Sequence, residues 1–137
     1  MCKEEITARE TICYIPNKLL ISTETARNSE IAEIFRVHPD VFLANEDRDF
    51  NVLVVFLMYE RSKGPESFWH PYFETVQLVD LPALWEDEDI EKLQDPELVE
   101  NIKYFKERLG LDWESLKSII QVYTPQYFSE EKQVYDD

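Results

Sequence analysis

Glycine is almost absent from this chain, since Gly64 and Gly110 are the two glycines among its 137 residues. Tight β-hairpin turns favour backbone conformations that glycine adopts most easily, and phosphate-binding loops need several glycines close together. The scarcity therefore disfavours an all-β fold built on hairpins and a glycine-rich phosphate loop. A content of 44% apolar and 13% aromatic residues suffices for a hydrophobic core, so we expect one domain or part of a larger one.

The formal net charge is −15 at pH 7. Direct nucleic-acid binding is disfavoured, because phosphate contacts need clustered lysine and arginine. The charge suits a protein partner with a basic segment, or it simply solvates the surface. No apolar run approaches the roughly 20 residues that span a bilayer, and the amino end has no hydrophobic signal core. We expect no membrane partner and a cytoplasmic or nuclear location.

The amino-terminal third predicts one short β element and one helix. Residues 10–23 are rich in β-prone side chains, with Pro16 interrupting the run. Thr23 then offers an N-cap for a helix over residues 24–35, which the His38-Pro39 pair ends. Three apolar residues share one face of this helix: Ile31, Ile34 and Phe35.

The run FNVLVVFLMY, residues 50–59, fits either a buried strand or a buried helix, and its pattern alone does not decide between them. From Leu81 onward the sequence pattern predicts helices. Asp95-Pro96 forms a typical helix start, and we expect Gly110 to end that helix. Asp112 would then cap another short helix. The prediction is a mainly α fold with a short N-terminal β element and a polar tail at 129–137.

Catalytic motifs are not apparent. His38 and His70 each lie beside a proline and outside the common nucleophile and metalloprotease patterns. Cys2 and Cys13 lack metal-ligand spacing, and the acidic run at 86–89 lacks the alternation of a calcium loop. We therefore expect no metal, and the residues by themselves indicate a helical module without evident catalytic machinery.

Three segments nevertheless resemble a known family in the same order. IPNKLLISTETARNS begins at Ile15, MYERSKGPESFWHPYFETV at Met58 and LPALWEDEDIEKLQDPELVE at Leu81. They resemble the SET-domain protein methyltransferase family that contains Rubisco large-subunit lysine methyltransferases and actin-histidine methyltransferase. The residues that carry the motifs are Pro16, Trp69, Pro71, Tyr72, Trp85, Leu93 and Gln94.

This resemblance implies a partial α+β SET domain together with its helical insertion. Residues 1–25 would hold an N-terminal SET strand segment, and residues 26–128 the insertion that forms one wall of the substrate cleft. The Trp69 to Phe73 corner would be buried packing, and residues 50–63 would be helical. Substrate contacts are expected at the helix start, Phe50 and Asn51.

The resemblance implies that family members bind S-adenosylmethionine with a GxG loop and an Asn-His motif and carry a catalytic tyrosine further along the chain. This sequence contains no GxG and no Asn-His pair. We therefore expect no catalytic or cofactor-binding residue and no cofactor for this chain alone, although S-adenosylmethionine is implied for the full-length family protein. The implied function is a portion of a protein lysine or histidine N-methyltransferase, and whether this chain is itself an enzyme stays open. The alternative is a non-catalytic, degenerate SET-like module for protein interaction.

Overall fold

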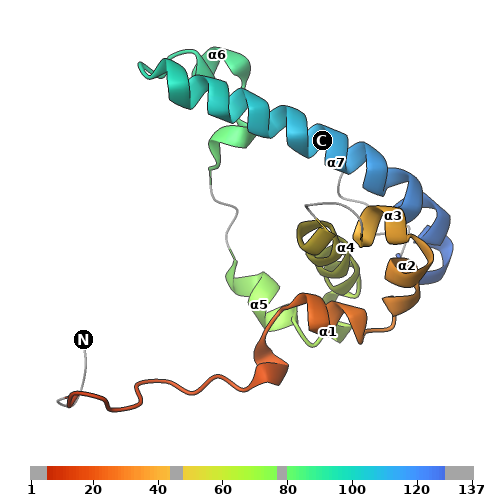
Figure 1. Ribbon diagram of the computed structural model, residues 1–137. Helices are drawn as coiled ribbons and strands as arrows, with labels where there is room; N and C mark the ends of the chain where they lie inside the picture. The colour runs from red at the N-terminus through yellow and green to blue at the C-terminus, as the bar shows by residue number, and fades with distance from the viewer. Residues whose placement is uncertain (1–5, 44–47, 77–79, 129–137) are drawn as a thin grey trace.

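The computed structural model describes residues 6–43, 48–76 and 80–128, so the predicted tail at 129–137 lies outside the described residues. The secondary structure that it assigns is helical throughout (Figure 1). In chain order the elements are η1 (Asn17–Leu19), α1 (Thr23–Arg27), α2 (Ala32–Val37), α3 (Pro39–Phe42), α4 (Arg48–Ser62), η2 (Gly64–Glu66), α5 (His70–Thr75), η3 (Pro82–Leu84), α6 (Asp87–Ile90) and α7 (Pro96–Tyr127).

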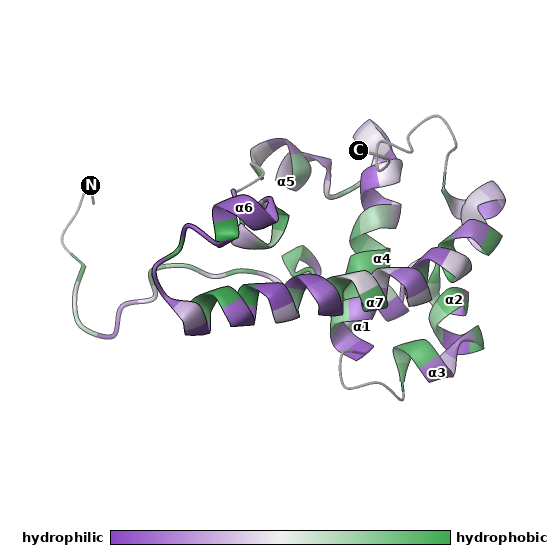
Figure 2. Ribbon diagram, turned by 90° about the horizontal axis from the view of Figure 1, so that it is seen from above, coloured by the Kyte–Doolittle hydropathy of each residue, from purple (hydrophilic) through white to green (hydrophobic). Residues whose placement is uncertain are grey.

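Helix α4 lies at the centre of the main helical body and contacts α1, α3, α5 and α7. Its apolar residues cover most of its surface, as expected for a helix surrounded by others (Figure 2). Val52, Val55 and Phe56 are fully or almost fully buried. The ambiguous run at 50–59 is therefore a helix, as the resemblance predicted.

The main core joins α4 to the short helices before it and to the second half of α7. The predicted stripe of Ile31, Ile34 and Phe35 is buried, which confirms that face. Phe35 and Phe42 meet edge to face with 5.1 Å between ring centroids. The core residues are Ala26, Ile31, Ile34, Phe35, Phe42, Val52, Val55, Phe56, Tyr59, Trp69, Leu116, Ile119 and Phe128.

The predicted helix over residues 24–35 is wrong in its continuity, because it divides into α1 and α2. The N-cap is Ser22 rather than Thr23, since the Ser22 Oγ accepts a hydrogen bond from the Thr25 backbone N–H at 3.2 Å. The first helix ends at Arg27 with Asn28 as its C-cap, and the Ser29 hydroxyl donates to the Ala26 carbonyl at 2.6 Å. Side-chain hydrogen bonds of this kind compete with the helix backbone.

Helix α7 confirms one predicted boundary and corrects two others. Asp95 Oδ1 accepts from the backbone N–H groups of Glu97 and Leu98, each at 3.1 Å, so the predicted Asp95-Pro96 start is confirmed. Gly110 does not end the helix, and Asp112 does not begin another. Both lie inside one continuous helix, where Asp112 faces Arg108 across 3.6 Å.

A satellite cluster forms away from the main core, where η3 and α6 pack on the first half of α7 (Figure 1). Ile90 and Ile102 are buried there, outside the main core. Lys106 links α7 to the segment around α6, because its Nζ donates to the Trp85 carbonyl at 2.8 Å and to the Asp87 carboxylate at 2.9 Å. Helix α7 thereby connects the two clusters.

The segment before η1 projects from the helical body as an extended arm (Figure 1). Ile12 and Tyr14 are strongly exposed on it. No strand is assigned within the described ranges, and a strand requires a neighbouring strand to supply its hydrogen bonds. The short β element and the SET fold therefore stay predictions.

None of the helices in the described ranges is long and apolar enough to cross a bilayer.

Candidate functional site

The turn from α4 to α5 is organised by a buried carboxylate. Glu60 is buried near the end of α4, and its two oxygens accept from Ser67 Oγ and from Lys63 Nζ, the latter at 3.0 Å. The Ser67 Oγ also accepts the Trp69 backbone N–H at 3.0 Å. Because a buried charge needs partners, Glu60 fixes the path of the chain into the aromatic corner.

Tyr59 provides a second polar contact beside this carboxylate. Its hydroxyl donates to the Glu30 carboxylate, which links α4 to the α1–α2 region. Burial, and then the hydrogen bond to Glu30, raise the pKa of the Tyr59 hydroxyl above its ordinary value. The Lys63 ammonium lies 5.0 Å from the centre of the Tyr59 ring. The arrangement holds a proton on Tyr59 rather than releasing it.

Sequence reasoning did not find this polar group. Glu60 does carry a signal, because it continues the four-residue spacing of Val52 and Phe56 on a buried helix face. A charged residue at such a position predicts a buried partner. Ser67 and Glu30 carry no comparable pattern, since their proximity arises from the tertiary fold.

The aromatic corner is partly as predicted. Trp69 is buried in the main core and precedes Pro71, which occupies the first turn of α5. Phe73 is half-buried and packs against that core. Tyr72 is 45% exposed and points away from the core's interior, so its predicted burial is wrong. Because α5 is short, only one of its faces packs against the main core.

The predicted substrate contacts lie at the opposite end of α4. Nine residues of helix separate Asn51 from Glu60, which is roughly 14 Å along the axis, so the corner and these contacts are not brought together. Phe50 is 46% exposed. Asn51 is completely buried, and among the described residues neither its Nδ2 nor its Oδ1 has a hydrogen-bond partner.

The remaining motif residues have structural positions. Pro16 is the residue before η1, and Trp85 follows η3 and donates its indole N–H to Asp80 at 2.6 Å. Leu93 is half-buried between α6 and α7, and Gln94 is exposed next to the Asp95 cap. None of these four lies in the main core.

The histidines do not form a catalytic pair. His38 lies between α2 and α3, and its ring meets that of Tyr123 edge to face at 5.8 Å between centroids. His70 opens α5. Across the described ranges, no group of three or more histidine, cysteine, aspartate or glutamate side chains is placed to hold a metal ion.

Two of the concavities on the described surface lie at α1 and at α7. One, of about 400 Å³, is lined by mostly polar residues around the start of α1: Asn17, Lys18, Leu20, Ser22, Glu24, Thr25 and Asn28. Several of these polar groups already bond each other, as when the Thr25 Oγ1 donates to the Leu20 carbonyl at 2.9 Å. The other, of about 260 Å³, lies between η3 and α7.

Comparison with known proteins finds actin-histidine N-methyltransferases among the relatives. The chain is 28% identical over 103 residues to the actin-histidine N-methyltransferase of Callithrix jacchus, 27% to that of Mus musculus and 26% to that of Homo sapiens. Each match covers 72% of this chain. The chain is distantly related to methyltransferases.

The similarity is partial, because the matched part spans 16% of the length of these curated relatives. No protein-family model matches the chain. No solved structure matches it significantly. The similarity is therefore to one part of these methyltransferases.

Proposed function

We propose that this chain forms the substrate-side helical wall of a SET-domain protein N-methyltransferase that uses S-adenosylmethionine and modifies lysine or histidine. The observation that carries the proposal is the similarity over 103 residues to proteins named actin-histidine N-methyltransferase. The helical body around α4, with Trp69 buried at its corner, agrees with a packing role for the matched aromatic motif.

The methyl donor does not fit the residues described here. Sites for molecules of that size are mostly apolar and measure about 300–1,000 Å³. The concavity at the start of α1 is large enough but has Leu20 as its one apolar residue, and the groove beside η3 is smaller than that range. We therefore propose that the donor site lies outside this sequence, and we assign no catalytic step to these residues.

The start of α4 is the proposed contact with the methyl-accepting protein. An unpaired polar group that is buried costs about 1–3 kcal/mol, so the free carboxamide of Asn51 is expensive to retain. A peptide backbone offers both the donor and the acceptor that a carboxamide requires. The half-exposed ring of Phe50 supplies an apolar surface beside it. Because Asn51 is completely buried, the proposed contact requires the helix start to open when the substrate binds.

Reading the genomic sequence on both sides of this coding region tests the proposal first. In-frame GxG coding upstream and Asn-His coding downstream are expected. The product of that longer frame should transfer a tritiated methyl group from S-adenosylmethionine to a lysine or histidine of a protein. Stop codons on both sides, or a longer product without transfer, would contradict the proposal.

Variants of the longer product then test whether Asn51 contacts the protein substrate. Asn51→Ala should raise the KM for the protein substrate at least about tenfold, the factor that 1.4 kcal/mol of lost binding represents, with the affinity for S-adenosylmethionine unchanged. Gln121→Ala, which removes an exposed carboxamide from α7, is the matched control and should change neither quantity. Equal kinetics for the two variants would remove Asn51 from the substrate site.

The isolated chain should transfer no methyl group and should show no saturable binding of S-adenosylmethionine by titration calorimetry. A chain that lacks the donor site cannot align the methyl group with an acceptor nitrogen. Tight stoichiometric binding would mean that the chain holds the donor itself.

A non-catalytic interaction module is the second candidate. The observation that favours it is the exposed apolar groove between η3 and α7, which needs no methyl donor to be of use. Stop codons flanking this coding region would favour this candidate over the methyltransferase.

A further inference from the structure

The groove between η3 and α7 is an apolar surface of the satellite cluster, and no residue of α4 lines it. Its sides come from two elements, and its volume is about 260 Å³. That volume is below the range of typical small-molecule sites and suits one or two anchoring side chains. The lining residues are Leu81, Pro82 and Ala83 at η3, and Asn101, Ile102 and Phe105 on α7.

The two elements that form the groove also carry exposed apolar side chains. Phe105 is 51% exposed, and Leu84 on η3 is more exposed still. Leu98 is also exposed, and lies on the same face of α7 because it is separated by seven residues from Phe105. Exposed apolar patches mark sites of protein contact more often than isolated apolar residues do.

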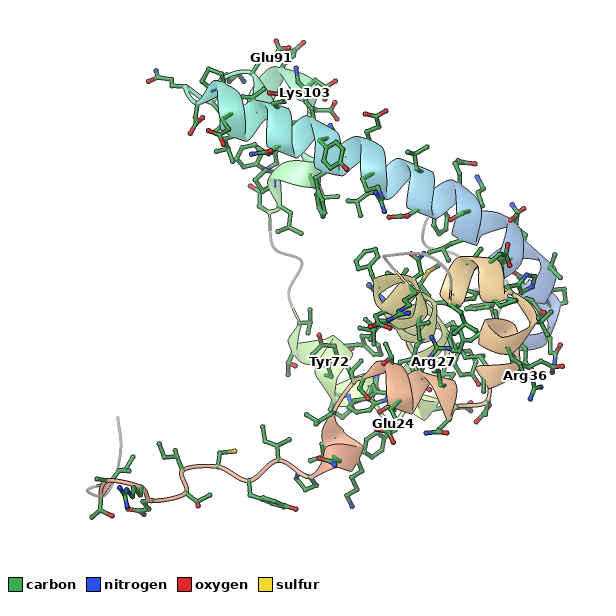
Figure 3. All side chains as sticks on the ribbon, viewed as in Figure 1. Glu24, Arg27, Arg36, Tyr72, Glu91 and Lys103 are labelled. Carbon is green, nitrogen blue, oxygen red and sulfur yellow. The ribbon has the colours of Figure 1, made fainter. Side chains whose placement is uncertain are left out.

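The charge around the groove indicates what can dock there. Between residues 80 and 107 the sequence has ten acidic and three basic residues. All three lysines are already paired: Lys92 with Asp89, Lys103 with Glu91 at 3.2 Å, and Lys106 with Asp87 at 2.9 Å (Figure 3 labels the Glu91–Lys103 pair).

The remaining acids leave an unbalanced negative field. Glu86, Glu88, Glu97 and Glu100 are exposed and have no ion pair within the described ranges. A second copy of the chain would bring the same negative charge to the interface, and like charges at close range are unfavourable. A segment with lysine or arginine around an apolar anchor matches both the groove and its rim.

We propose that the η3–α7 groove is a docking site for a basic, amphipathic segment of a partner protein. An apolar side chain of that segment inserts between Leu81 and Phe105, and its flanking lysines or arginines lie against Glu97 and Glu100. The inference does not depend on the proposed methyltransferase function, since neither Phe50 nor Asn51 lines the groove.

A labelled amphipathic peptide of leucine and lysine in helical order is the probe, with fluorescence anisotropy as the readout. It should bind the purified chain, and Phe105→Ala should weaken the binding at least about tenfold, as expected for loss of a central anchor. Leu111→Ala is the matched control, because it removes an exposed apolar side chain from α7 outside the groove. Circular dichroism should show that both variants keep the helical content.

The charge contribution is tested separately. Glu100→Lys should weaken binding severalfold, and Glu114→Lys elsewhere on α7 should weaken it less. A peptide with glutamate in place of lysine should not bind.

Four outcomes would overturn the proposal: no binding of the leucine–lysine peptide, equal affinity for Phe105→Ala and Leu111→Ala, a dimer of the chain that Phe105→Ala disrupts, or no binding to the native-length polypeptide. The last two would show that a second copy or another part of the same polypeptide covers the groove.

Discussion

At the scale of single residues, the two ends of α4 differ in how their buried polar side chains are hydrogen-bonded. The end near Glu60 is satisfied: each carboxylate oxygen has a donor, and the turn that follows is fixed. At the other end, the buried carboxamide of Asn51 has no hydrogen-bond partner among the described residues. Unsatisfied buried groups of this kind are rare in folded proteins, and this contrast supports the proposal that the Asn51 end contacts a substrate.

Trp69 is the aromatic residue on which the corner's stability depends. Trp69→Ala should lower the free energy of unfolding by about 3–5 kcal/mol, because it deletes a buried ring from the main core. Phe68→Ala, on a neighbouring ring that is 61% exposed, should cost below about 1 kcal/mol. Urea melts of the two variants make the comparison. Similar costs for both would mean that the corner does not pack as described.

We expect Asn51 to lower the free energy of unfolding of the chain while it contributes to substrate binding. Asn51→Leu keeps a similar volume and removes the unpaired carboxamide, so it should raise the free energy of unfolding by about 1–3 kcal/mol. Urea melts of this chain provide the measurement. A loss of stability would indicate that the carboxamide is hydrogen-bonded in solution, which would weaken the case for a waiting substrate contact.

Tyr59 predicts a loss of stability in alkali. Its pKa is raised in the folded chain above the ordinary value of 10.0, first by burial and then by the bond to Glu30. Its contribution is complete below about pH 10. Above that pH the unfolded chain releases the proton while the folded chain keeps it, so the free energy of unfolding falls.

Tyr59→Phe isolates this effect from the ionisation of lysines. On passing from below pH 10 to well above it, the variant should lose less stability than the wild type in urea melts, because it has no phenol to ionise. Parallel losses in the two proteins would contradict a raised pKa at Tyr59.

At the scale of elements, the boundaries fixed by local chemistry could be predicted, and those fixed by packing could not. Asp95 and Pro96 started α7 as expected, because an N-cap acts on the next three residues alone. Gly110 carries a helix-ending preference that α7 overrides, since Leu116 and Ile119 beyond it are buried in the main core.

Gly110 therefore supplies a direct test of the continuous helix. A Cβ added at Gly110 would meet nothing within 4 Å, so Gly110→Ala should raise the free energy of unfolding by about 0.5–1 kcal/mol. Gly64→Ala is the contrasting control, because the φ of 58° at Gly64 is left-handed and alanine there should destabilise the chain by about 1–2 kcal/mol. If Gly110→Ala lowers the free energy of unfolding in urea melts, the helix ends at that position and is not continuous.

At the scale of the whole molecule, the sequence indicated a helical body and the resemblance to methyltransferases, and the relatives found support that resemblance in part. The satellite groove could not be foreseen, because Leu81 and Phe105 lie 24 residues apart and meet only when η3 folds onto α7. The lack of a hydrogen-bond partner for Asn51 among the described residues could not be foreseen either, because it depends on the positions of all the side chains around it. The proposed SET sheet remains a prediction, since its test requires strands beyond the described residues.

The most direct test of the central claim is the intact mass and peptide map of the native polypeptide, captured from its source cells with an antibody against α7. We predict a polypeptide larger than the 16.4 kDa of this sequence, whose additional peptides include a GxG segment and an Asn-His segment. A native polypeptide of 16.4 kDa, or a longer one without both segments, would contradict the assignment of this chain to the wall of a methyltransferase.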